Sequence, residues 1–287
     1  MDKMEIRRRI VEDGYAVLPG LLSEEKILQL NSIVGNFFKK NGTLYNLGKT
    51  QPNASMECPD LGFVFYDPKV VEAFRAAIGV DDIVFTGHCD IHQDMFSSWH
   101  KDTGRDHGYF EEDCFVDDCC VVKMGIYLQD QAPGDGLTIQ PGSHREHEIR
   151  FMKGTPLATK AGDAVLFDVR ISHHGRLADR VDRFLHLMNK GQKKVRARIQ
   201  GSKKPGDIAQ YYAIKQLYDR ALQRSTRRSI FFTYGAPNRF TEQFSRANMV
   251  RQQGQYLSHS AYYPEELIEG LQMQGVKLFD PASTSIA

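Results

Sequence analysis

The spacing of apolar residues changes twice along the chain. Before residue 80 these residues recur every three or four positions, as on the buried face of an amphipathic helix. Between residues 83 and 190 they form short runs separated by Gly, Pro and Asp, a pattern typical of β-strands. After Gly201 the helical spacing returns. The pattern predicts a core of strands flanked by helices at both ends.

The predicted elements follow directly from this spacing. Helices are predicted over residues 6–11, 23–41, 69–78, 207–224, 241–253 and 264–273. Strands are predicted over residues 15–18, 83–85, 119–128, 137–139, 164–167, 184–188 and 229–234. Residues 43–62, rich in Gly, Asn, Pro and Ser, are expected to form a loop. The chain then divides into a strand core with its N-terminal helices, residues 1–200, and a mainly helical extension packed on that core, residues 201–287.

Composition narrows the class of protein. The 287 residues are 41% hydrophobic and 25% charged, with a formal net charge of +1, so neither a nucleic acid nor an anionic membrane is demanded as a partner. The five cysteines include no C-x-x-C pair, which argues against a disulfide framework or a structural zinc site. No apolar run is long enough to span a bilayer. We expect a cytoplasmic protein that acts on a small molecule, with no nucleic acid and no membrane as partner.

An acidic segment interrupts the predicted strands. Residues 103–118 contain six carboxylates and few apolar residues. The segment is either a solvated surface loop or a mobile lid over the mouth of the strand core, and the sequence leaves both alternatives open.

A histidine and a carboxylate are separated by one residue in the segment Ser97–Asp102. On an extended strand, residues i and i+2 point to the same side, so the side chains of His100 and Asp102 are expected to converge. Ser98 shares this alternation and is expected to face the same space. A single H-x-D motif is weak evidence for a metal site, because a surface histidine beside a solvated aspartate gives the same pattern.

A second histidine strengthens the metal hypothesis. Gly162-Asp163 predicts a turn into an apolar strand, and His173 and His174 follow that strand closely. One further imidazole beside His100 and Asp102 would complete two nitrogens and one carboxylate. This set is the facial triad of non-haem Fe(II) oxygenases, which leaves metal positions open for a bidentate 2-oxo acid and for dioxygen.

Basic residues after the second histidine could bind an anion. A guanidinium can hold a carboxylate with two parallel hydrogen bonds. Of Arg176, Arg180 and Arg183, we favour Arg183, because it begins the strand predicted over residues 184–188. The alternative for each of these arginines is a surface ion pair with a neighbouring aspartate. Lys123, in the middle of an apolar run, either extends outward to solvent or assists co-substrate or substrate binding.

Several segments together resemble the phytanoyl-CoA dioxygenase family. These are the opening segment from Asp13 to Glu25, the H-x-D motif at residues 99–102, the turn from Gly134 to His144, and the segment from Gly162 to His173. Gly134-Asp135 stands where the family has Asn-Gly. The resemblance spans about residues 10–190 and is specific as a set.

The resemblance implies a mainly β fold with flanking helices, built on a double-stranded β-helix (jelly-roll, cupin-like) core. It implies Fe(II), 2-oxoglutarate and O2, with His100, Asp102 and His173 as metal ligands, and its register selects His173 over His174. Arg183 falls near the family's 2-oxoglutarate arginine, with Arg180 as the alternative. The carboxylate of Asp102 favours hydroxylation or a related oxidation over halogenation, since related halogenases carry a small residue in its place.

Three rival functions remain open at the level of sequence. The first is a cupin-like metal enzyme that does not use 2-oxoglutarate, and the second is a non-catalytic ligand-binding protein on the same fold. The third is a nucleic-acid demethylase, suggested by the small basic cluster Arg224, Arg227 and Arg228 and opposed by the near-zero net charge.

Overall fold

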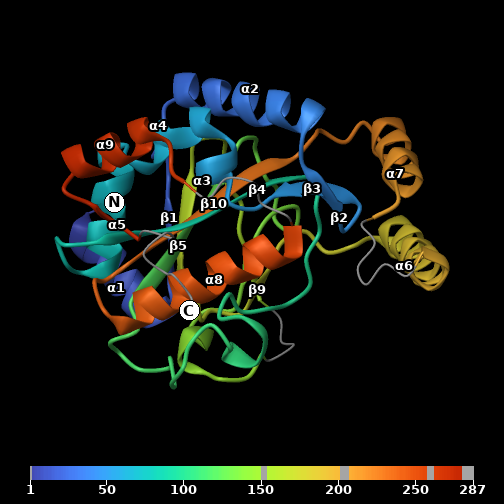
Figure 1. Ribbon diagram of the computed structural model, residues 1–287. Helices are drawn as coiled ribbons and strands as arrows, with labels where there is room; N and C mark the ends of the chain where they lie inside the picture. Colours follow the sequence, from blue (N-terminus) through green and yellow to red (C-terminus); the bar gives the residue numbers. More distant parts are fainter. Residues whose placement is uncertain (1, 150–153, 201–206, 257–261, 280–287) are drawn as a thin grey trace.

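The computed structural model describes residues 2–149, 154–200, 207–256 and 262–279 (Figure 1). The helices are α1 (Lys3–Asp13), α2 (Glu24–Lys40), α3 (Ala54–Glu57), η1 (Pro59–Leu61), α4 (Gly62–Phe65), α5 (Pro68–Ile78), η2 (Arg105–His107), η3 (Ser143–Arg145), α6 (Arg180–Gln200), α7 (Ala209–Ala221), α8 (Arg239–Tyr256) and α9 (Glu265–Met273). The strands are β1 (Tyr15–Leu18), β2 (Thr43–Tyr45), β3 (Gly48–Gln51), β4 (Val84–Gln93), β5 (Val121–Tyr127), β6 (Thr138–Ile139), β7 (Thr155–Pro156), β8 (Ala164–Asp168), β9 (His173–His174), β10 (Arg228–Gly235) and β11 (Lys277–Leu278).

The helix that begins at the predicted cap illustrates how sequence signals act locally. The Ser23 hydroxyl accepts a hydrogen bond from the backbone N–H of Lys26, and two glutamates follow in the first turn of α2. Leu30 and Val34 on one face of α2 are fully buried. The helix predicted here is therefore confirmed.

Two antiparallel sheets form the core. The large sheet has the order β1-β8-β5-β10-β4-β3-β2, with β11 added parallel to β4, and the small sheet has the order β7-β6-β9. An isolated bridge between His100 and His173 extends the small sheet by one more segment. This arrangement confirms the predicted mainly β fold with flanking helices.

Alternation along the strands separates the two faces of the large sheet. Met124, Leu166 and Phe232 point to the face covered by α1, α2 and α5, where the main hydrophobic core lies (Figure 1). Tyr127 and Phe231 point to the opposite face and pack against apolar residues of β6 and its surroundings. The inner face of the large sheet and the small sheet therefore enclose the space into which the candidate ligands project.

The strand predicted over residues 184–188 is wrong. These residues lie within α6, with Leu185 buried and Phe184, Leu187 and Met188 exposed. A short apolar run cannot be assigned to strand or helix by periodicity alone, and the surrounding Lys, Arg, Gln and Leu residues favour helix. Residues 43–62, expected to be a loop, contain β2, β3 and short helices.

After β9 of the small sheet, the chain next contributes a strand only after α6 and α7, and this strand joins the large sheet. It is β10, which pairs with β5 on one side and with β4 on the other. The strand predicted over residues 229–234 is confirmed, and it lies in the middle of the sheet. The part of the chain after residue 200, expected to be a helical extension packed on the core, therefore also supplies a central strand of that core.

The central position of β10 predicts that a substitution there destabilises the protein more than a similar substitution on α6. Ile230 is fully buried in β10, whereas Leu187 on α6 is 68% exposed. Replacing Ile230 by valine should lower the free energy of unfolding by about 0.5–1.5 kcal/mol, because a buried methylene is lost. The matched Leu187→Val substitution should change it by less than about 0.5 kcal/mol. Urea unfolding of both variants measures the difference, and equal effects would argue against a central β10.

No helix in the described part of the chain is long and apolar enough to cross a membrane.

Candidate active site

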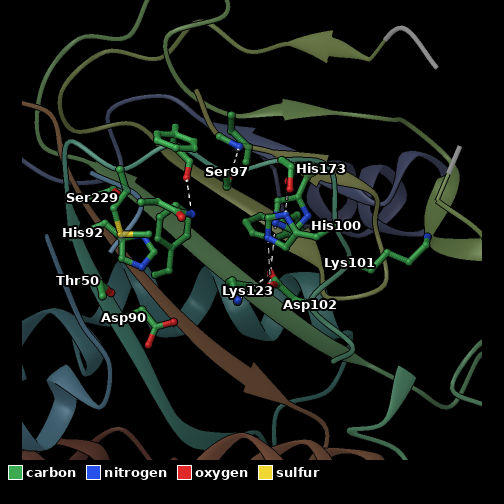
Figure 2. A pocket seen from close by; sticks show the side chains of 18 of the residues that line it. Thr50, Asp90, His92, Ser97, His100, Lys101, Asp102, Lys123, His173 and Ser229 are labelled. Carbon is green, nitrogen blue, oxygen red and sulfur yellow. Dashed lines mark hydrogen bonds and ion pairs between the residues drawn. The ribbon is translucent and has the colours of Figure 1, made fainter. Parts of the chain in front are cut away.

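His100, Asp102 and His173 come together at one wall of the space between the sheets (Figure 2). His100 and His173 exchange both backbone hydrogen bonds, each 2.9 Å, and the Asp102 N–H donates to the carbonyl of Val169 at 2.8 Å. The H-x-D segment is thus a single bridge followed by a turn, shorter than the expected strand. The expected convergence holds all the same, while the intervening Lys101 points away and donates to the Ser143 and Arg170 carbonyls at 2.6 Å each.

The ligand atoms of these three side chains lie within 4.8 Å of one another. Nε2 of His100 is 3.8 Å from Oδ1 of Asp102, and Nε2 of His173 is 3.4 Å from Oδ2. These separations leave room for one ion about 2.1 Å from each atom. Among the described residues, no other group of histidine, cysteine and carboxylate side chains brings three ligand atoms together in this way.

Backbone carbonyls orient both imidazoles for metal binding. Nδ1 of His100 lies 2.7 Å from the Ser98 carbonyl, and Nδ1 of His173 lies 3.0 Å from the Ile171 carbonyl. A carbonyl can only accept, so each Nδ1 carries the proton and each Nε2 keeps a lone pair. Two such nitrogens and one carboxylate fit the donor set of a non-haem Fe(II) site.

Electrostatics keep the ligand groups in the forms that bind a metal. Burial and the neighbouring His100 lower the pKa of His173 to about 3, so this imidazole is neutral. Burial raises the pKa of the Asp102 carboxyl, but the attraction of Lys123, His173 and His100 outweighs it and holds the pKa well below its usual range. The Lys123 ammonium lies 2.7 Å from Oδ2 of Asp102. Lys123 is therefore buried beside the triad, and the alternative of an outward side chain is wrong.

The triad opens into a cavity of about 960 Å³. Ser98 and Lys123 line it together with the three ligands. The acidic segment contributes Asp106 and His107 to the lining, and β4 contributes His88, Asp90 and His92, which share one strand face as their alternation requires. A cavity of this size suits a small-molecule ligand.

Arg180 and Arg183 are not among the residues that line this cavity. Both are exposed on α6, and Nε of Arg183 donates to the carbonyl of Asp179 at 3.3 Å. The structure therefore does not bring either arginine to the triad. The cavity is lined instead by Arg176, which precedes α6, and by Arg227 and Arg228 at the start of β10.

Alternation at the start of β10 separates the two adjacent arginines. Arg228 donates to Gln93 at the end of β4 at 3.0 Å and to Asn31 on α2 at 2.6 Å, so its side chain points toward α2. Arg227 shares the inward alternation of Ser229, and its guanidinium donates to the Asp135 carbonyl at 3.2 Å. Burial, followed by the repulsion of Arg176, lowers the pKa of Arg227. This end of the cavity therefore favours an anion.

Arg176 adds a second guanidinium to the same end. Its Nη1 lies 2.5 Å from the fully buried carboxylate of Asp182, and its side chain is only 10% exposed. Its Nε and Nη2 atoms are buried and have no hydrogen-bond partner among the described residues. Two unused donors beside Arg227 fit a bound carboxylate.

The sequence carried a signal for Arg227 that we interpreted differently. Arg224, Arg227 and Arg228 form a basic cluster, for which the sequence suggested a solvated helix end or a nucleic-acid contact. The informative feature is an arginine two residues before Ser229 and directly ahead of the apolar run 230–234. Such spacing places both side chains on one strand face.

A polar wall faces the cavity from β4 and α8. Asp90 on β4 lies 3.2 Å from Nε2 of His88 and 3.8 Å from Arg251 on α8. Asn248, fully buried on α8, accepts a hydrogen bond from Arg251 at 2.9 Å. The Arg251 guanidinium also lies 5.9 Å from the centre of the Tyr109 ring. This wall offers donors and acceptors to a polar ligand.

The histidines of β4 that line the cavity, His88 and His92, predict a pH dependence of stability. Burial lowers the pKa of His92 to about 4 and also lowers that of His88, whereas an unfolded histidine titrates near 6.5. Between about pH 6.5 and pH 4 the unfolded chain binds more protons than the folded chain, so stability falls with falling pH. The Tm of metal-free protein should fall across this window, and less steeply for His92→Gln. An unchanged slope in the variant would contradict the assignment.

The sequence and the structure give different results when they are compared with known proteins. No protein-family model matches the sequence, and no curated protein matches it. The structure is similar to the non-heme alpha ketoglutarate dependent epimerase SnoN from nogalamycin biosynthesis, with a TM-score of 0.54, 12% identity, and coverage of 81% of each chain.

Two further solved structures are similar over comparable lengths. EctD from S. alaskensis, solved with 2-oxoglutarate and 5-hydroxyectoine, gives a TM-score of 0.54 and 15% identity over 82% of this chain and 76% of that chain. HygX from Streptomyces hygroscopicus, solved with nickel and 2-oxoglutarate bound, gives a TM-score of 0.53 and 16% identity over 81% of this chain and 86% of that chain. At these identities the likeness shows a shared fold. The chain therefore has the jelly-roll fold on which these enzymes are built.

Proposed function

We propose that this protein is an Fe(II)- and 2-oxoglutarate-dependent oxygenase related to the phytanoyl-CoA dioxygenase family, which hydroxylates a C–H bond of a small molecule. The observation that carries the proposal is the convergence of His100 Nε2, His173 Nε2 and the Asp102 carboxylate at the wall of one cavity. The same cavity has a cationic end, formed by Arg176 and Arg227. SnoN, EctD and HygX, which share the fold, are described with alpha ketoglutarate or 2-oxoglutarate, and this supports the same co-substrate here.

In this proposal Arg227 replaces Arg183 as the residue that holds the distal carboxylate of 2-oxoglutarate. Arg227 faces inward beside Ser229, and Arg176 offers two unused donors at the same end. Both guanidinium groups are largely removed from solvent, so their attraction for a carboxylate is weakly screened. Arg180 and Arg183 face solvent on α6 and take no part in the site.

The protein's own groups would position the reactants. The carbonyls of Ser98 and Ile171 hold the two imidazoles in the tautomer that presents Nε2, and the Lys123 ammonium holds Oδ2 of Asp102. The polar wall of β4 and α8 would bind the substrate on the far side of the cavity. When bound, Fe(II) and 2-oxoglutarate supply the oxidising chemistry, with one atom of O2 entering the substrate hydroxyl, the other entering succinate, and CO2 released.

The first test separates co-substrate binding from turnover. The purified protein is titrated without oxygen with Fe(II) and then with 2-oxoglutarate, and the visible charge-transfer band of the chelate is recorded. Its appearance, followed by succinate formation when oxygen is admitted with a candidate substrate, would support the proposal. Metal binding without a band on adding 2-oxoglutarate would point to a cupin-like metal enzyme. Failure to bind Fe(II) would point to a non-catalytic binding protein.

A further inference from the structure

Helices α6 and α7 form a hairpin at one side of the molecule, attached to the core through Leu185 and Tyr211 (Figure 1). The hairpin and its immediate flanks expose an unusual number of large apolar side chains. They are Leu177, Phe184, Leu187, Met188, Val195, Ile214, Leu217 and Leu222. Exposed apolar residues scattered singly, as elsewhere on the described chain, need no explanation, but eight gathered on one helix pair and its flanks indicate a contact surface.

The exposed residues of α6 follow a helical spacing. Phe184, Met188 and Val195 stand at positions i, i+4 and i+11, so they lie along one stripe of the helix, and Leu187 lies beside it. The opposite, buried stripe of α6 contains Leu185 and Asn189. Helix α6 therefore has one apolar contact with the body of the protein and a second apolar stripe that meets solvent.

Basic residues surround the exposed stripe. Those that are exposed on α6 are Arg180, Arg183, Lys190, Lys194, Arg196 and Arg198. None of the six forms an ion pair with another described residue. The described carboxylates of the hairpin are already engaged, since Asp182 pairs with Arg176 and Lys215, Asp207 pairs with Lys193, and Asp219 pairs with Lys215 and Arg224. The face that α6 presents to solvent is therefore both apolar and strongly cationic.

We propose that α6 docks this protein on an anionic lipid surface. A helix with an apolar stripe bordered by Lys and Arg can bury the stripe at the boundary between headgroups and acyl chains while its bases meet anionic headgroups. A second copy of the chain fits this face less well, because it would place two cationic helices against each other. Nucleic acid would pair with the Lys and Arg side chains of α6 but leave the apolar stripe in water.

Docking of α6 would bring the cavity to the lipid surface. Leu185 on the inner side of α6 packs in a cluster with Leu47 and with Phe96, which lines the cavity. Arg176, which also lines the cavity, is held by Asp182 of α6. The near-zero net charge had suggested no membrane partner, but that sum combines the acidic segment 103–118 with the basic α6 and hides their separation. The inference concerns surface binding and does not rest on the proposed chemistry.

The test is sedimentation of the full chain with vesicles. One set of vesicles is phosphatidylcholine alone, and the other contains about 30% phosphatidylserine. One variant reverses charge on α6 (Lys190→Glu with Lys194→Glu), and one removes apolar surface (Phe184→Ser with Leu187→Ser). The matched controls lie on α2, where Lys39, Lys40 and Leu28 are also exposed: Lys39→Glu with Lys40→Glu, and Leu28→Ser. Thermal unfolding of every variant verifies that it is folded.

We expect the protein to sediment with anionic vesicles, more weakly at high salt and hardly at all with phosphatidylcholine. Each α6 variant should bind at least about tenfold more weakly, while both α2 controls bind normally. Absence of binding, or binding that the α6 variants leave unchanged, would overturn the proposal. So would a dimer in analytical ultracentrifugation that dissociates in the Phe184→Ser with Leu187→Ser variant, since a second copy would then cover the stripe. Duplex DNA binding as tight as vesicle binding would also overturn it, if that binding depended on the Lys and Arg side chains of α6 and not on the apolar stripe.

Discussion

Replacing His173 by alanine should abolish 2-oxoglutarate turnover and weaken Fe(II) binding by more than about 100-fold. Loss of a hydrogen-bond partner of a metal ligand typically costs 10- to 100-fold, and loss of the ligand itself should cost more. The remaining atoms, Nε2 of His100 and a carboxylate oxygen of Asp102, are 3.8 Å apart and would hold the metal on two sides only. Anaerobic titration with Fe(II), followed by the visible band on adding 2-oxoglutarate, measures both effects.

The neighbouring histidine provides a matched control. His174 is also buried, but it does not belong to the group of three converging ligand atoms, and its ring packs edge-on against Trp99, with 4.5 Å between the ring centres. His174→Ala should retain Fe(II) binding and the visible band. Retention of the band in His173→Ala together with its loss in His174→Ala would show that the register of the second histidine is misassigned.

Replacing Arg227 by alanine should raise the KM for 2-oxoglutarate by about 30- to 1000-fold, corresponding to about 2–4 kcal/mol. The substitution removes a largely desolvated guanidinium from the cationic end of the cavity, where a charge-assisted hydrogen bond is strong. Arg227→Lys should recover only part of the affinity, because an ammonium cannot make the two parallel bonds of a guanidinium. The dissociation constant of 2-oxoglutarate from the anaerobic Fe(II) enzyme is the appropriate measurement.

Two other arginines serve as controls for this experiment. Arg183→Ala should leave the affinity for 2-oxoglutarate within about twofold of the wild type, because an exposed arginine contributes little. Arg228→Ala should lower stability through the lost bonds to Gln93 and Asn31, with little effect on 2-oxoglutarate. A large loss of affinity in Arg183→Ala, with none in Arg227→Ala, would restore the assignment made from the sequence.

The candidate metal ligands illustrate what the sequence determines by itself. His100 and Asp102 are two residues apart, so a local extended backbone is enough to make them converge, whatever the rest of the chain does. The turn at Gly162-Asp163 and the apolar run after it likewise mark the strand that leads to His173. Helix α2 was predictable for the same reason, since its cap, charges and apolar stripe all act within a few residues.

The placement of Arg227 at the cationic end of the cavity shows what only the tertiary structure decides. The chain leaves the sheet after β9, forms α6 and α7, and returns as β10, so distance along the sequence from His173 gives no measure of distance in space. The apolar run 184–188 suits a strand or a helix equally well by composition, and it became a helix because Leu185 finds its partners in Leu47 and Tyr211.

Contacts between segments remote in sequence also decide the direction of individual side chains. Arg227 and Arg228 are chemically alike and adjacent, and only the pairing of β10 between β4 and β5 sends one inward and the other toward α2. Lys123 faces the cavity because Asp102, in the turn that follows the His100–His173 bridge, provides the countercharge that makes its burial tolerable. Local sequence thus determined most of the elements and the candidate metal ligands, whereas contacts between segments remote in sequence determined the structure of residues 184–188 and which charged groups surround the candidate ligands.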